Sequence, residues 1–233
     1  MQVTSPAAPR HDIYAGIHKA LRAFMTDTLG RVGWMDALDP VDLAETLSQV
    51  KSLLEICAGH LQHENDFIHR AMEARRPGTA ARIAGEHVDH EQHIAALRTA
   101  VSAVERASAA ERPRLAHDLY RALARFIADN FEHMEYEETE HNAVLWSAYS
   151  DAEIAQIEQN LVRSLPPDET MTVWRWMIPY KNHAERVAML SGMRQFAPRH
   201  VFEGALALAR SHLSDRDWAK LATALELTVA KAA

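Results

Sequence analysis

The sequence predicts an all-α protein, an up-down-up-down four-helix bundle with an additional C-terminal helical region. Helix-breaking residues are few, with 8 Gly and 9 Pro in 233 residues. Between the breakers, apolar residues recur at spacings of three and four, as on one face of an α-helix. Long helices joined by short turns bury such faces best as a bundle of this topology.

Start and stop signals divide the first two-thirds of the chain into long helices. Gly30 and Gly33 are expected to end the first of them. Asp39 followed by Pro40 is a helix start, with a capping carboxylate and proline in the first turn. Thr79 is expected to cap the third helix. The predicted helices cover residues 9–29, 40–74, 79–107 and 113–149.

The pattern changes after residue 150, where prolines separate about five shorter helices. Capping boxes are predicted at Ser150-x-x-Glu153 and Asn182-x-x-Glu185. We therefore expect residues 10–150 to form the bundle with its metal site. Residues 151–233 are expected to form an extension that packs on the bundle or on a partner subunit.

Composition excludes several classes of function. The net charge is -7 and the basic residues are scattered, which argues against nucleic acid as a partner. No run of 18 apolar residues predicts a membrane span. Residues 1–6 lack a signal-peptide layout, and the single cysteine, Cys57, excludes an intramolecular disulfide. These features together favour a cytoplasmic location.

The unusual feature is histidine, with 14 residues. Each predicted long helix places histidine on its apolar face, and two of them add glutamate there. Candidate metal ligands are His18, His60, Glu64, His87, His90, His133 and Glu137. The other histidines of this part are expected at the surface or in support of the ligands: His11, His63, His69, His93, His117 and His141. The roles of His63 and His141 stay open, because these two flank candidate ligands.

Two of these pairs share one spacing, His60-x-x-x-Glu64 and His133-x-x-x-Glu137. Residues four apart on an α-helix differ by about 40° in direction, so both side chains of a pair point the same way. A single pair is most often an exposed ion pair. Two pairs facing one core favour a metal site, because an unpaired buried carboxylate is strongly penalised. Imidazole with carboxylate suits Fe, Mn or Zn.

The order of these residues resembles the hemerythrin family, in particular its bacterial HHE cation-binding branch, over residues 10–150. The C-terminal part is similar to the tails of longer bacterial members. The resemblance implies that the bundle holds two non-haem iron ions. The ligands that carry over are His18, His60, Glu64, His133 and Glu137.

Two departures from the family pattern concern the third and fourth helices. His87 and His90 lie three residues apart, where oxygen carriers of the family have two histidines four apart. Glu86 and His90 do have that spacing, which leaves open whether Glu86 replaces His87. In the fourth helix the acid is Glu137, four residues after the histidine, in place of an aspartate five residues after. This difference argues against simple reversible oxygen carriage.

The leading functional hypothesis is a di-iron protein that binds or senses dioxygen or related small oxidants such as peroxide and nitric oxide. Manganese or zinc could take the place of iron. One alternative is a ferritin-like di-iron oxidase or peroxidase, which expects Glu-x-x-His on two helices. The chain offers only one well-formed case, Glu138-x-x-His141, and it lies off the inferred apolar face, so this alternative ranks lower. Another is an iron-storage or regulatory module without turnover. A homodimer through the C-terminal helices is a further expectation.

Overall fold

The structure, a computed structural model, describes residues 10–227. The predicted fold class is confirmed, since these residues form helices and no strand. The chain divides into two compact units. One comprises the chain up to Ala15 together with Met25–Leu165, and the other comprises Gly16–Phe24 together with the chain from Pro166 onward. Pro9, the predicted start of the first helix, and residues 1–6 lie outside the described residues.

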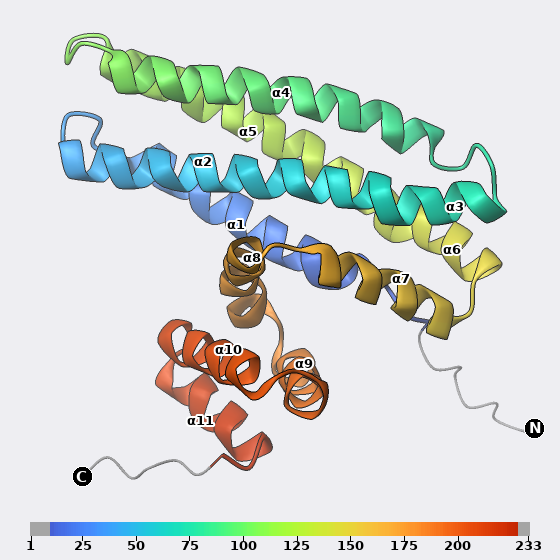
Figure 1. Ribbon diagram of the computed structural model, residues 1–233. Coiled ribbons are helices and arrows are strands. Elements are labelled where there is room, and N and C mark those ends of the chain that lie inside the picture. Colours follow the sequence, from blue (N-terminus) through green and yellow to red (C-terminus); the bar gives the residue numbers. More distant parts are fainter. Residues whose placement is uncertain (1–9, 228–233) are drawn as a thin grey trace, which may run out of the picture. The chain divides into compact units, whose positions relative to one another are not determined.

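The first unit contains the bundle (Figure 1). Its long helices run in alternating directions, with α4 beside α5 and α2 beside α4. Two of them continue through a short π-helical segment into a further helix. The helices are α1 (Ala15–Trp34), α2 (Pro40–His63), η1 (Glu64–His69), α3 (Arg70–Arg75), α4 (Ala81–Arg106), α5 (Arg112–Tyr136), η2 (Glu137–His141), α6 (Asn142–Ala148) and α7 (Asp151–Ser164). Within α1, the stretch Gly16–Phe24 is counted with the second unit.

Local capping explains where several helices begin. The Asp39 side chain accepts hydrogen bonds from the backbone amides of Val41 and Asp42, as predicted for the start of α2. The capping box of Ser150 and Glu153 starts α7 and is also confirmed. In each case the carboxylate or hydroxyl satisfies backbone N–H groups that the first turn of a helix leaves without partners.

The predicted end of the first helix is wrong, because α1 continues through both glycines to Trp34. Gly33 instead allows a close approach to α5. A Cβ atom at Gly33 would lie 3.2 Å from a ring carbon of Tyr120. Here glycine serves helix packing, a role that depends on a residue far away in the sequence.

The predicted cap of the third helix is also wrong. The Thr79 hydroxyl donates to the carbonyl of Arg76 at 2.7 Å, and α4 begins at Ala81. The carboxylate of Glu73 takes the capping role from the preceding helix. It accepts hydrogen bonds from the amides of Gly78 and Ala80 at 2.7 and 3.0 Å.

Apolar layers enclose a polar layer along the bundle. On α5 the buried side chains Leu119, Leu123 and Phe126 precede the polar stretch that begins at Asn130. Beyond that stretch an apolar cluster closes the bundle: Ile13, Tyr14, Ile68, Met72, Ala80, Leu145 and Ile154. The polar side chains between these layers are therefore shielded from water on both sides along the helix axes.

The second unit contains the shorter helices α8 (Pro167–Tyr180), α9 (His183–Phe196), α10 (Arg199–His212) and α11 (Asp215–Ala224). Its core is apolar and consists of Ile178, Leu190, Ala205, Ala209, Leu221 and Leu225. Within this unit Trp176 stacks on Phe24, with 4.3 Å between the ring centroids.

Arg186 is buried in the second unit, and its guanidinium donates to the backbone carbonyls of Ile178, Pro179 and Lys181. The predicted capping box of Asn182 and Glu185 is present at the start of α9.

None of the helices within residues 10–227 combines the length and the apolar character that crossing a membrane would require.

Candidate metal centre

Two glutamates lie in the core of the first unit. Glu64 is 1% exposed and begins η1, and Glu137 is 0% exposed and begins η2. Each follows a histidine of the preceding α-helix by four residues. Glu64 therefore points to the same side as His60, and Glu137 to the same side as His133. Burying two carboxylates side by side is costly unless positive charge lies beside them.

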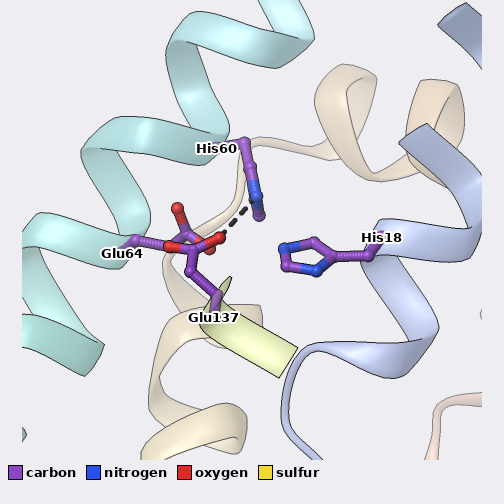
Figure 2. Close-up of side chains that lie close together, drawn as sticks. All are labelled: His18, His60, Glu64 and Glu137. Atoms are coloured by element: carbon purple, nitrogen blue, oxygen red, sulfur yellow. Dashed lines mark ion pairs between the residues drawn. The ribbon is translucent and has the colours of Figure 1, made fainter. Parts of the chain in front are cut away.

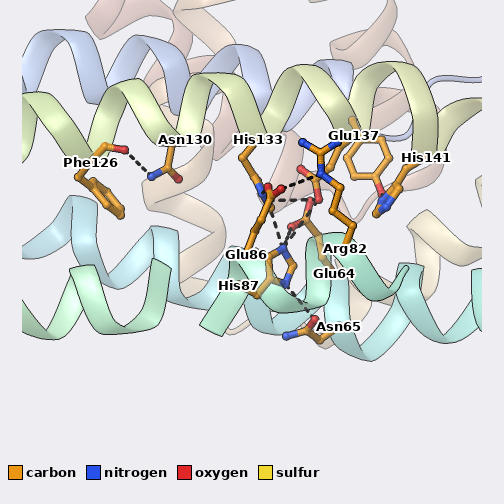
Figure 3. Close-up of polar contacts among 11 residues, drawn as sticks. Glu64, Asn65, Arg82, Glu86, His87, Phe126, Asn130, His133, Glu137 and His141 are labelled. Atoms are coloured by element: carbon orange, nitrogen blue, oxygen red, sulfur yellow. Dashed lines mark hydrogen bonds and ion pairs between the residues drawn. The ribbon is translucent and has the colours of Figure 1, made fainter. Parts of the chain in front are cut away.

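Histidines from α4 and α5 meet these carboxylates (Figure 3). Glu64, His87, His133 and Glu137 each offer a ligand atom, and these atoms all lie within 4.8 Å of one another. The Nε2 atoms of His87 and His133 are 3.2 Å apart. His87 Nε2 lies 3.4 Å from an oxygen of Glu64, and His133 Nε2 lies 3.4 Å from an oxygen of Glu137.

Hydrogen bonds to the outer ring nitrogens fix how these imidazoles point. His133 Nδ1 donates to Glu86 at 3.0 Å, because an ionised carboxylate can only accept. Arg82 in turn holds Glu86 at 2.9 Å. On the other ring, His87 Nδ1 lies 2.9 Å from the side-chain oxygen of Asn65. Both rings therefore turn Nε2 toward the carboxylates, which is how outer hydrogen bonds orient metal-ligating histidines.

The electrostatics show that this cluster attracts positive charge. Burial lowers the pKa of His87, but the hydrogen bonds that its ring donates to Glu137 and Glu64, together with the negative charges of these carboxylates, outweigh burial and raise the pKa to about 9. The pKa of His133 is raised in the same way. Burial and the charge of Glu64 raise the pKa of Glu137, yet hydrogen bonds from the two histidines lower it overall. A metal cation fits this set, since it would replace the protons that the imidazoles otherwise hold.

A second set contains the same two carboxylates (Figure 2). His18 and His60 offer ligand atoms that lie within 4.8 Å of each other and of ligand atoms from Glu64 and Glu137. His60 Nε2 is 3.1 Å from a Glu64 oxygen. His18 comes from α1, which runs unbroken from Ala15 to Trp34; Ala15 and the residues of α1 from Met25 onward belong to the first unit. The two four-residue sets thus have both glutamates in common.

Six of the seven predicted ligands lie in these two sets, and His90 lies in neither. His90 is three residues beyond His87, which moves it about 4.5 Å along α4 and about 60° around it. Its ring instead packs edge-on against His133 and near Phe126. Glu86 is also outside the sets, because its carboxylate faces the outer nitrogen of His133.

Two further histidines are buried here: His69, which was expected at the surface or in support of the ligands, and His141, whose role the sequence left open. They are 5% and 1% exposed, and together with Glu137 they form a third group whose ligand atoms lie within 4.8 Å of one another. A signal was available, because a histidine follows each glutamate by five or four residues. The five-residue spacing does not match an α-helical face, so the pattern went unrecognised.

The fold and the site define a class of protein, the helical-bundle proteins that bind a cation between imidazoles and carboxylates. The sequence profile of the Hemerythrin HHE cation binding domain matches residues 11–143. The chain therefore belongs to the hemerythrin HHE cation-binding family, as the order of its ligand types predicted. No match to a curated protein or to a solved structure was found.

Proposed function

We propose that the protein binds two non-haem iron ions in the bundle and uses them to bind or sense dioxygen or a related small oxidant. The observation that supports this proposal is that both four-residue sets contain the same two carboxylates. A carboxylate has two oxygens and can bridge two adjacent cations. The proposed ligands are His18, His60, Glu64, His87, His133 and Glu137.

The proposed ligands differ in charge. Two glutamates offset part of the charge of the ions, and the imidazoles bind as neutral ligands. When bound, two iron ions would supply the redox chemistry that binding or sensing of dioxygen and related small oxidants uses. Mixed nitrogen and oxygen ligands are compatible with manganese and zinc as well.

A polar pocket of about 230 Å³ lies beside this site. It lies between α4 and α5 and reaches the buried rings of His90 and His133. Its other lining residues are charged or polar: Arg82, Glu86, Asp89, His93, Asp129 and Glu132. Such a lining disfavours bulky apolar ligands.

Iron loading tests the proposal. Protein loaded with ferrous iron without oxygen should hold about two ions per chain, and admitting oxygen should produce near-ultraviolet charge-transfer bands. Glu64→Ala and Glu137→Ala should each lose the iron and keep the helical circular-dichroism spectrum. His183→Ala and His212→Ala, at exposed positions of the second unit, are the controls and should keep the iron. A content near one ion, or equal loss from all four variants, would contradict the proposal.

Three further sequence-based statements remain predictions. They are the domain boundary between residues 150 and 151, a homodimer through the C-terminal helices, and a cytoplasmic location. Light scattering of the full chain measures the mass in solution and tests the homodimer directly.

A further inference from the structure

We propose that His69, Glu137 and His141 form a third metal-binding position, for a divalent transition-metal ion, next to the two-ion site. The proposal rests on the proposed function, because Glu137 belongs to both. The three ligand atoms lie within 4.8 Å of one another. An ion with bonds of about 2.1 Å holds its ligand atoms at most about 4.2 Å apart. Small side-chain movements would therefore be enough to close this set around an ion.

Two buried ring nitrogens point to an ion at this position. Nε2 of His69 and Nε2 of His141 have no hydrogen-bond partner within residues 10–227, although both side chains are at least nine-tenths buried. Unsatisfied buried nitrogens are costly and uncommon. On the other side of the His141 ring, the Tyr14 hydroxyl lies 3.2 Å from Nδ1. The hydroxyl can accept from Nδ1–H, which leaves the lone pair of His141 on Nε2.

Both histidines come from π-helical segments, but the spacing from the buried glutamate is five residues for His69 and four for His141, and only the first conflicts with an α-helical face. His69 is the last residue of η1 and His141 is the last residue of η2, and each segment begins with a buried glutamate. Along an α-helix, residues five apart differ by about 140° in direction, so Glu64 and His69 would face different sides. A π-helical turn is wider and brings residues five apart toward one face. Such turns are rare and are frequent at functional sites.

The composition of the group indicates its ligand class. Two imidazoles and one carboxylate with open positions suit ferrous iron, and imidazole also suits zinc, while magnesium and calcium prefer oxygen ligands. The carboxylate of Glu137 offers about four lone-pair sites, so it can be shared between positions. This position has only one carboxylate, and neighbouring cations repel a further ion. It should therefore bind more weakly than the two-ion site.

Zinc titration of the full chain tests the proposal. Metal-free protein is dialysed against rising concentrations of free zinc, and the bound zinc is counted. The wild type should bind about two ions tightly and a third at higher zinc. The double variant His69→Ala with His141→Ala should lose only the third, weakly bound zinc ion. The control, His117→Ala with His212→Ala, removes two exposed histidines and should keep all three.

Two results would overturn the third position. In one, wild type and the His69/His141 variant both saturate at two ions. In the other, the wild type binds two and the variant binds one, which would make these histidines ligands of the two-ion site. The variant His69→Gln with His141→Gln keeps polar side chains and should give the same loss if the alanine variant unfolds.

A separate variant distinguishes failure of the two-ion site. The double variant His60→Ala with His133→Ala should lose the two tightly bound zinc ions and keep the third, weakly bound one. If this variant binds zinc as the wild type does, the two-ion site is wrong. The third position is then still decided by the His69/His141 variants.

Discussion

In the second unit, Arg186 is the one buried charged side chain among residues 166–227. Its guanidinium donates to three backbone carbonyls at 2.9, 2.9 and 2.7 Å, so its hydrogen-bonding needs are met locally. In the first unit, Glu64 and Glu137 share one small volume with histidines whose ring nitrogens turn toward them. Both units bury charged side chains, but only the first unit brings several ligand atoms of carboxylates and imidazoles close together. Convergence, and not burial of charge, therefore marks the site.

Removing the metal should have the largest effect in this comparison. A ligand that binds only the folded state stabilises it by about 4 kcal/mol when its concentration is a thousand times its Kd. The free energy of unfolding of the iron-loaded protein should therefore fall by about 4 kcal/mol per tightly bound ion when a chelator is added. Thermal unfolding followed by circular dichroism measures this change. For Glu137→Ala the chelator should change nothing, and an unaffected wild type would contradict the prediction.

Arg186→Met tests the other half of the comparison. It leaves three carbonyls without their donor, and an unsatisfied buried acceptor costs about 1–3 kcal/mol, so a loss of about 3 kcal/mol is expected. Chemical denaturation measures it. The metal content should not change. Arg199→Met, at an exposed position paired with Glu203, is the matched control and should have little effect. A loss of metal from Arg186→Met would contradict the expectation that Arg186 takes no part in metal binding.

Glu86→Gln should weaken metal binding and leave the fold intact. The carboxylate orients His133 through Nδ1, and loss of such a partner typically costs 10–100-fold in metal affinity. Competition with a chelator of known affinity measures the change. Glu91→Gln removes an exposed carboxylate from the same helix and should bind as the wild type does. An unchanged affinity in Glu86→Gln would show that packing alone holds the His133 ring.

Glu153→Gln should have the smallest effect, because this carboxylate is on the surface. Hydrogen bonds from Arg75 and from Ser150 lower its pKa to about 2. With a folded pKa below the ordinary value near 4.5, its contribution to stability is full above that value and is lost as the pH falls through about 2. The difference in Tm between wild type and variant should therefore shrink with acidification. A difference that grows toward low pH would contradict this sign.

The sequence predicted most features that depend on neighbours along the chain. The start of α2 at Asp39 and Pro40 and the capping box at Ser150 were confirmed, because a capping side chain lies next to the amides it serves. The helical faces that carry His87 and His133 followed from one repeat of 3.6 residues per turn.

The features that were missed depend on distant contacts or on a change of that repeat. Glycine at position 33 accommodates Tyr120, which no local signal announces. The capping carboxylate of Glu73 reaches across a turn from another helix. His69 was missed because η1 departs from the α-helical repeat that the prediction assumed.

The two π-helical segments also set the rotational phase of everything beyond them. Deleting one residue from Asn65–Ile68 would restore ordinary helical hydrogen bonding in η1, yet it would turn the following residues by about 100° and draw them back by about 1.5 Å. The carbonyl of Ala71, which accepts from the Tyr149 hydroxyl at 2.6 Å, would face elsewhere. Arg75, which pairs with Glu153 at 2.6 Å, would turn away from it. The one extra residue in η1 is therefore needed both for the position of the His69 imidazole and for the contacts that close this end of the bundle.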